Sequence, residues 1–177
     1  MDINHQQDDF LETERLRLRR VTLEDADLML AIWNDPDFVR FVGDRGIRTV
    51  AEARVAMTEG ALRLFERFGY GPYCLVQKND NRRIGICGLF RRDNLEDPDI
   101  GFALLPPYCG AGLASEAALA VVEHARKDLG IETLTAIVSP DNAASIALIE
   151  KLGLSFERGI TMPDEDHEIC LYSMRLN

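Results

Sequence analysis

Residues 99–116, DIGFALLPPYCGAGLASE, decide the fold, because they combine an apolar run, a proline stop, a glycine turn and a helix start. The apolar run at residues 100–105 is typical of a buried β-strand. The two prolines that follow end the strand, since proline cannot donate to a ladder and restricts the residue before it. Gly110 and Gly112 then allow a tight turn that leaves no side chain between the backbone and a ligand.

A helical pattern begins at Ala114, so the glycine turn leads into a helix N-terminus. Backbone N–H groups converge at such an end and attract anions, which indicates a ligand that carries phosphate. A plain strand-to-helix turn uses glycine for geometric reasons alone, so this stretch by itself leaves both interpretations open. The chain has no Gly-x-x-x-x-Gly-Lys-Ser/Thr run and no Gly-x-Gly-x-x-Gly run after a strand, so two common phosphate-binding loops fit poorly.

Three motifs together resemble one enzyme family. Residues 109–114, CGAGLA, resemble the acetyl-coenzyme A pyrophosphate loop of the GNAT acetyltransferases, whose pattern is Arg/Gln-x-x-Gly-x-Gly/Ala. Gly112 and the alanine two residues later match its last fixed positions, whereas Cys109 stands where Arg or Gln is usual. Residues 139–154 resemble the Asn-x-x-Ser and Glu-Lys-Leu-Gly segment of the RimJ/RimL-like branch, which modifies the N-termini of ribosomal proteins. Residues 11–19 are similar to the opening of that branch, so the resemblance spans nearly the whole chain.

The resemblance implies a GNAT-like α/β fold, with a mixed sheet of six to seven strands flanked by helices on both faces. Residue periodicity in chain order also predicts a mixed α/β sheet with a mostly antiparallel start. The expected strands are 16–19, 73–77, 83–90, 100–105, 133–138 and 168–175. The expected helices are 26–33, 50–68, 114–129 and 143–151, the first two opened by capping boxes, and residues 38–48 look irregular. We expect residues 1–9 to be a flexible tail and residues 10–177 to be a single GNAT domain.

Composition narrows the class of protein. No apolar run of the 177 residues reaches the roughly 18 that a membrane span needs, and residues 1–9 are polar and acidic, unlike a secretory signal. The formal net charge of −10 at pH 7 argues against nucleic-acid binding and favours a cationic partner. The cysteines are scattered without Cys-x-x-Cys spacing, at Cys74, Cys87, Cys109 and Cys170. We therefore expect reduced thiols, a cytoplasmic location and no metal. For the oligomeric state, we expect either a monomer or a homodimer.

The resemblance further implies an acyltransferase that moves acetyl from acetyl-coenzyme A to a primary amine by direct attack in a ternary complex. The acceptor is either a protein N-terminal α-amine or a small-molecule amine. The backbone of the central strand pairs with the pantetheine arm in the family, and the glycine loop holds the pyrophosphate. The coenzyme contacts implied for this chain are Phe102, Leu104, Leu105, Cys109, Gly110, Ala111, Gly112, Leu113, Ala114, Ser115, Asn142 and Ser145.

Two polar residues near the last predicted helix have implied roles. Asn142 matches the family's coenzyme-contacting asparagine, although a helix cap would equally explain an asparagine there. Ser145 matches the serine that the RimJ/RimL-like branch uses near the thiolate leaving group. Ile149 occupies the place of a tyrosine acid found in many relatives, so Ser145, a water or another residue must protonate the leaving group.

The catalytic base is implied less directly. Asp99 stands where the branch often has Glu, and it could accept the amine proton directly or through water. Because Asp is one methylene shorter than Glu, a water relay is favoured. An exposed strand-edge carboxylate is the equal alternative. Asp93, His167 and Glu168 are further candidates for the base.

The type of amine sets how much base is needed. An α-amine of pKa about 8 is roughly a tenth neutral at pH 7, whereas a lysine near 10.4 is about one part in 2,500 neutral. That difference corresponds to about 3 kcal/mol of barrier, so a weak or water-mediated base fits an N-terminal amine better than a lysine. A non-catalytic coenzyme A-binding regulatory protein of the same fold is the alternative, favoured by Cys109 and Ile149, and a nucleotide-binding module is a remote third possibility.

Overall fold

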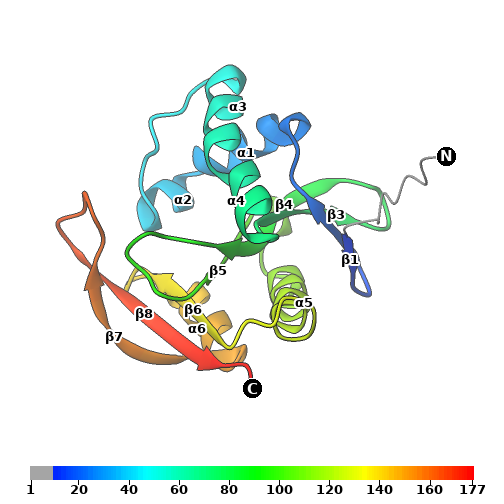
Figure 1. Ribbon diagram of the computed structural model, residues 1–177. Helices are drawn as coiled ribbons and strands as arrows, with labels where there is room; N and C mark the ends of the chain where they lie inside the picture. Colours follow the sequence, from blue (N-terminus) through cyan, green and yellow to red (C-terminus); the bar gives the residue numbers. More distant parts are fainter. Residues whose placement is uncertain (1–9) are drawn as a thin grey trace.

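The computed structural model describes residues 10–177, so the tail expected at residues 1–9 lies outside the described residues. One mixed sheet of eight strands, in the order β1-β2-β3-β4-β5-β6-β8-β7, forms the centre of the fold (Figure 1). The strands are β1 (Phe10–Glu12), β2 (Leu16–Arg20), β3 (Pro72–Gln77), β4 (Arg83–Phe90), β5 (Asp99–Leu104), β6 (Thr133–Val138), β7 (Ser155–Thr161) and β8 (Glu168–Arg175). The prediction of a mixed α/β sheet with helices on both faces is confirmed.

The sequence analysis missed two strands, the edge strands β1 and β7. The sheet therefore has eight strands, whereas six or seven were expected. β1 has only three residues, too few to show an alternating pattern. β7 leaves most of its side chains exposed, so burial imposes no apolar alternation on its sequence.

The helices are α1 (Ala26–Trp33), α2 (Pro36–Phe41), α3 (Val50–Glu59), α4 (Ala61–Phe68), α5 (Leu113–Lys127) and α6 (Ala143–Lys151), with 3-10 turns at Leu23–Asp25 and Pro106–Tyr108. The capping boxes expected before the first two predicted helices are confirmed and lie at Thr22, before the 3-10 turn that leads into α1, and at Thr49, before α3. The single helix expected over residues 50–68 is wrong, because Gly60 leaves the helical region and separates α3 from α4. The segment expected to be irregular, residues 38–48, begins inside α2, a six-residue helix too short to show periodicity.

The strands β5 and β6 diverge in the middle of the sheet. β5 pairs with β4 along its whole length, but among the described residues it meets β6 only where Asp99 lies opposite Thr135. The backbone N–H and the hydroxyl of Thr135 both donate to the Pro98 carbonyl at 3.0 Å, which fixes this junction. Beyond it, the β5 edge has no strand partner in the part of the chain that the structure describes. We call this gap the wedge, and its unpaired backbone groups are open to a ligand that carries amides.

A buried carboxylate joins the first helix to the sheet. Asp25, which is 0% exposed, accepts hydrogen bonds from both terminal nitrogens of Arg19, from Nη1 of Arg83 and from the Thr22 backbone N–H. Burial alone would raise the pKa of Asp25, but the hydrogen bonds and the charge of Arg19 outweigh it, so the pKa lies below its usual value. The ionised form of Asp25 therefore contributes to stability.

Replacing Asp25 should destabilise the fold strongly. We expect Asp25→Ala to lower the free energy of unfolding by about 3 kcal/mol at pH 7, since it removes one partner from a buried ion pair. Because the pKa of Asp25 is lowered on folding, the difference in the free energy of unfolding between wild type and variant should be largest above about pH 4. It should shrink as the pH falls through the lowered pKa. Urea unfolding at pH 7 and pH 3 measures it.

Asp27 provides the matched control, because its carboxylate also binds Arg83 but its side chain is 57% exposed. Asp27→Ala should cost at most about 1 kcal/mol. Equal losses for the two variants would contradict the importance of the buried network.

Candidate active site

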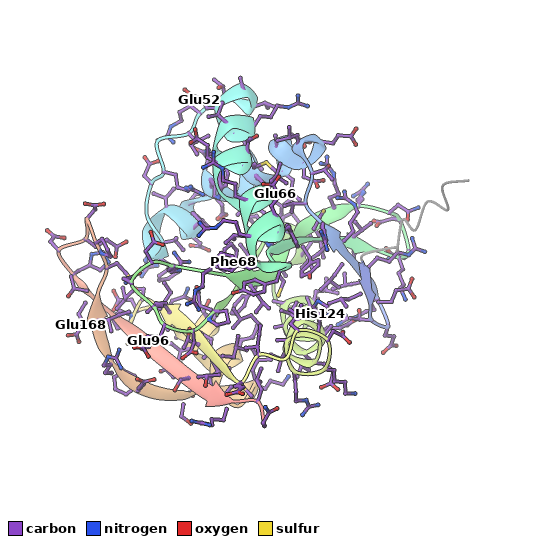
Figure 2. The ribbon with its side chains drawn as sticks, viewed as in Figure 1. Glu52, Glu66, Phe68, Glu96, His124 and Glu168 are labelled. Atoms are coloured by element: carbon purple, nitrogen blue, oxygen red, sulfur yellow. The ribbon has the colours of Figure 1, made fainter. Side chains whose placement is uncertain are left out.

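A cleft of about 1000 Å³ opens at the wedge and continues under the first four helices. The wedge side of its lining comes from β5, β6 and α6: Asp99, Ile100, Gly101, Phe102, Ala103, Ile137, Val138, Ser139, Asn142, Ser145 and Ile149. The opposite wall is largely aromatic and cationic, with Trp33, Phe38, Phe41, Arg45, Arg63, Arg67 and Phe68, the last of which is labelled at the end of α4 in Figure 2. The structure thus brings the two residues implied as catalytic, Asp99 and Ser145, into one cleft together with Asn142.

Asp99 is buried, with 1% of its surface exposed, so the alternative of an exposed strand-edge carboxylate is wrong. Its two oxygens accept from Nε of Arg92 at 3.1 and 3.2 Å. Burial raises the pKa of Asp99, and the charge and hydrogen bond of Arg92 offset only part of that rise. A carboxylate with a raised pKa in the lining of a cleft suits a proton acceptor.

The other candidate bases are less well placed. Asp93 lines the cleft but is exposed to solvent. His167 lines a separate hollow of about 300 Å³ between α2 and the β7–β8 loop, where Glu165 lies 3.5 Å away. Glu168 is exposed at the start of β8 (Figure 2). Of these groups, only Asp99 combines burial with a place in the cleft.

The first turn of α6 presents two polar side chains to the cleft. Oδ1 of Asn142 accepts from the Ser145 backbone N–H at 3.2 Å, so the predicted cap is confirmed. The Asn142 amide nitrogen and the Ser145 hydroxyl make no hydrogen bond with residues 10–177, and both remain available to a ligand. Ile149, which is buried, follows one turn later in the same lining and leaves no tyrosine hydroxyl there.

The predicted glycine turn has the geometry of an anion site. Gly110 and Gly112 have φ angles of 82° and 78°, in the left-handed region that glycine adopts most easily. Gly112 precedes α5 and no side chain caps this helix, so the N–H groups of residues 113–115 stay open. Cys109, in place of the usual Arg or Gln, is exposed, and its Sγ lies 3.7 Å from the Leu105 carbonyl.

A guanidinium from the β1–β2 turn holds this loop, and the sequence analysis missed it. Nη1 of Arg15 donates to the Ala111 carbonyl at 3.0 Å, and its Nε donates to Glu116 at 2.7 Å. The other oxygen of Glu116 accepts from the Thr13 hydroxyl at 2.6 Å and from the Arg15 N–H at 2.8 Å. Arg15 and Glu116 are 101 positions apart, so neither composition nor local pattern could pair them.

The five arginines in the cleft lining were also missed, Arg45 and Arg92 among them. Arg45 lies in the segment expected to be irregular, and Arg92 lies between β4 and β5 in a segment that looked merely acidic and polar. The usable signal was the pair of consecutive arginines at residues 91–92, directly after β4 and next to a segment with four acidic residues at positions 93–99.

Residues 10–177 contain neither a membrane-spanning helix nor a cluster of metal-binding side chains. None of the described helices is both long and apolar enough to cross a membrane. Within the same residues, no group of three or more His, Cys, Asp or Glu side chains is placed to hold a metal ion.

Known proteins resemble this chain in sequence over most of its length. The family model for the acetyltransferase (GNAT) domain matches residues 15–155. The chain is 30% identical over 148 residues to the uncharacterized N-acetyltransferase p20 of Bacillus licheniformis, which covers 83% of each protein. It is 32% identical over 132 residues to the probable N-acetyltransferase YjcK of Bacillus subtilis, which covers 68% of this chain and 71% of that protein.

Solved structures agree with the sequence comparisons. RimL, a ribosomal-protein alpha-N-acetyltransferase in complex with coenzyme A, superposes with a TM-score of 0.80 at 18% identity, over 94% of this chain and 97% of that one. At that identity the likeness shows the fold alone. An acetyltransferase from Agrobacterium tumefaciens superposes with a TM-score of 0.79 at 26% identity, over 93% of both chains. Together with the family match, these findings show that the chain belongs to the GNAT acetyltransferase family, of the RimJ/RimL type, and is an N-acetyltransferase.

Proposed function

We propose that this N-acetyltransferase moves acetyl from acetyl-coenzyme A to the α-amine of a protein N-terminus or of a small molecule, by direct attack in a ternary complex. One observation carries the proposal. The cleft at the wedge places a buried carboxylate, Asp99, and an unpaired hydroxyl, Ser145, beside a strand edge whose backbone groups are open.

The described residues fit the two polar parts of the coenzyme. The open edge of β5, at residues 102–104, offers backbone donors and acceptors to the amides of the pantetheine arm, whereas the backbone groups of Leu105 already bond to Ile84 and Tyr108. The N–H groups at the start of α5 and the glycine turn offer donors to the diphosphate, and Arg15, which is paired with Glu116, holds the loop through the Ala111 carbonyl. Asn142 and Ser145 lie in the same cleft as the arm's implied path.

The chemistry then follows from three placements. The neutral amine attacks the thioester carbonyl, so that a C–N bond forms while the C–S bond breaks. A water between the amine and Asp99 passes the amine proton to the carboxylate, whose pKa is raised by burial. The Ser145 hydroxyl donates a hydrogen bond to the departing thiolate, which is protonated from solvent.

Coenzyme binding should depend on the start of α5. We expect acetyl-coenzyme A at 100 times its Kd to raise the Tm of the wild type by about 5–10 °C. Ala114→Glu should abolish that rise, because the introduced carboxylate would lie where the diphosphate would bind. The variant should still fold, since an acidic residue in the first turn of a helix stabilises the helix. Thermal unfolding with and without acetyl-coenzyme A measures both effects. Leu119→Glu, on the same helix at a side chain that is 50% exposed, is the charge control and should respond like wild type.

Proton transfer should depend on Asp99. Asp99→Asn should lower kcat about 100-fold, within the range for loss of a general base, with little change in KM for acetyl-coenzyme A. Since the carboxylate must be ionised to accept a proton, wild-type kcat should fall as the pH drops through the raised pKa of Asp99. That limb of the pH profile should vanish in the variant.

Asp93 is the matched control for this test, because its exposed carboxylate lines the same cleft. Asp93→Asn should leave kcat and its pH profile unchanged. If Asp99→Asn also behaved like wild type, Asp99 would not be the base.

The type of acceptor tests the proposed function most directly. Thiol release should be at least 100-fold faster with a peptide that has a free N-terminus than with an N-terminally blocked peptide whose only amine is a lysine. Mass spectrometry of the products should place acetyl on the α-amine. Products modified on lysine alone would contradict the proposal, and tight acetyl-coenzyme A binding without turnover on any amine would favour the non-catalytic alternative.

A further inference from the structure

The cleft has a local charge opposite to that of the whole chain. Its lining holds five arginines and four carboxylates: Arg45, Arg63, Arg67, Arg91 and Arg92 against Glu59, Asp93, Asp99 and Glu165. Over the full sequence, acidic residues outnumber basic ones by 30 to 20. An acidic protein that gathers guanidinium groups around its candidate active site is better suited to an anionic group than to a polyamine.

Arg92 is held in place by the candidate base. Its Nε donates to both oxygens of Asp99, at 3.1 and 3.2 Å, so the orientation of the guanidinium is set by a buried group. Its terminal nitrogens make no hydrogen bond with residues 10–177, and the side chain is 40% exposed in the cleft lining. One guanidinium therefore touches the proposed base through Nε and keeps its other donors for a ligand.

Arg45 is held by an aromatic ring rather than by an acid. Its guanidinium carbon lies 4.4 Å from the centroid of the Trp33 ring, and Trp33 is only 5% exposed, so the core fixes this platform. No carboxylate among residues 10–177 forms an ion pair with Arg45. Burial lowers the pKa of Arg45, and the nearby positive charge of Arg92 lowers it further. A bound anion would relieve both effects.

Part of the wall is apolar. Aromatic and thioether side chains that line the cleft include Trp33, Phe38, Phe41, Phe68, Phe90 and Met162. Phe68, which is 37% exposed, presents part of its ring to the cleft and stacks on Tyr70 with ring centroids 5.7 Å apart. The cleft therefore offers an apolar surface next to the two arginines.

We propose that Arg45 and Arg92 bind a carboxylate of the acceptor, so that the acceptor is a free α-amino acid with an apolar side chain. The spacing supports an α-amino acid, because Arg92 contacts Asp99 directly and a single carbon separates the amine from the carboxylate in that class. Asp99, the proposed proton acceptor, and Arg92, which would bind the carboxylate, are therefore neighbours in the protein. The amine and the carboxylate are likewise neighbours in an α-amino acid. The proposal rests on the function proposed above and narrows its acceptor to a small molecule.

The kinetic test compares L-phenylalanine with L-phenylalaninamide. The amide has the less basic amine, so without carboxylate recognition it would react faster at pH 7. We expect wild type to prefer the free acid at least tenfold in kcat/KM. Arg45→Gln should lower kcat/KM for the acid by about 10- to 100-fold, which is the loss expected for a charge-assisted hydrogen bond. This loss should arise from a higher KM for the acid. The same variant should change the amide rate less than twofold and leave KM for acetyl-coenzyme A unchanged, and Arg45→Lys should restore part of the loss.

Arg40 is the matched control, because its guanidinium also stacks on a ring, 4.7 Å from the centroid of Phe41, but lines the smaller hollow and not the cleft. Arg40→Gln should behave like wild type with both substrates. Equal kcat/KM values for the acid and the amide in wild type would overturn the inference while leaving the acetyltransferase function intact.

A binding measurement keeps the inference testable without turnover. In the presence of free coenzyme A, N-acetyl-L-phenylalanine should bind to the wild type in isothermal titration calorimetry, at least tenfold more tightly than its carboxamide, and Arg45→Gln should remove this preference. If no amine were acetylated but this preference were found, the proposed function would fail, and carboxylate binding by Arg45 would stand without an acceptor role for the ligand. If only peptides were acetylated and the free acid did not bind, the inference would be wrong.

Discussion

The hydrogen bonds that Thr135 donates to the Pro98 carbonyl set the geometry on which the rest of the molecule depends. They hold β5 and β6 together at one point, and the strands diverge beyond it. A continuous sheet would use its backbone groups on neighbouring strands, whereas this one leaves an edge open next to Asp99. The candidate site is therefore a consequence of incomplete pairing, and the helices on both faces supply its walls (Figure 1).

The local charge of two regions of this protein differs in sign from the net charge of the whole chain. The chain carries a net charge of −10, yet its two candidate anion-binding regions are positive in different ways. The glycine loop relies on neutral backbone dipoles, which need no basic side chain and are supported by Arg15 from outside. The cleft relies on guanidinium groups held by Asp99 and by Trp33. The expectation of a cationic partner, based on net charge alone, does not describe the cleft.

Contacts between distant residues complete the site. Arg15, Thr13 and Glu116 join the first hairpin to the first turn of α5. Asp25 joins the first helical segment to β2 and β4 through Arg19 and Arg83. Each set uses a carboxylate that accepts several donors, so the position of a loop is specified by hydrogen bonds as well as by packing. These contacts fix the glycine loop before α5 and the first helical segment relative to the sheet.

The sequence by itself determined the parts of the fold that depend on local chemistry. An apolar run and glycines predicted β5, the glycine loop and α5, and capping boxes predicted the start of the first two helices. The motifs at Gly112, Asn142 and Ser145 predicted the family. Only the tertiary structure decided that Asp99 is buried against Arg92, that Arg45 stacks on Trp33 and that β1 and β7 extend the sheet. Local pattern carries no record of these features, because burial and ion pairing depend on segments that meet only when the chain has folded, and exposed edge strands need no apolar alternation.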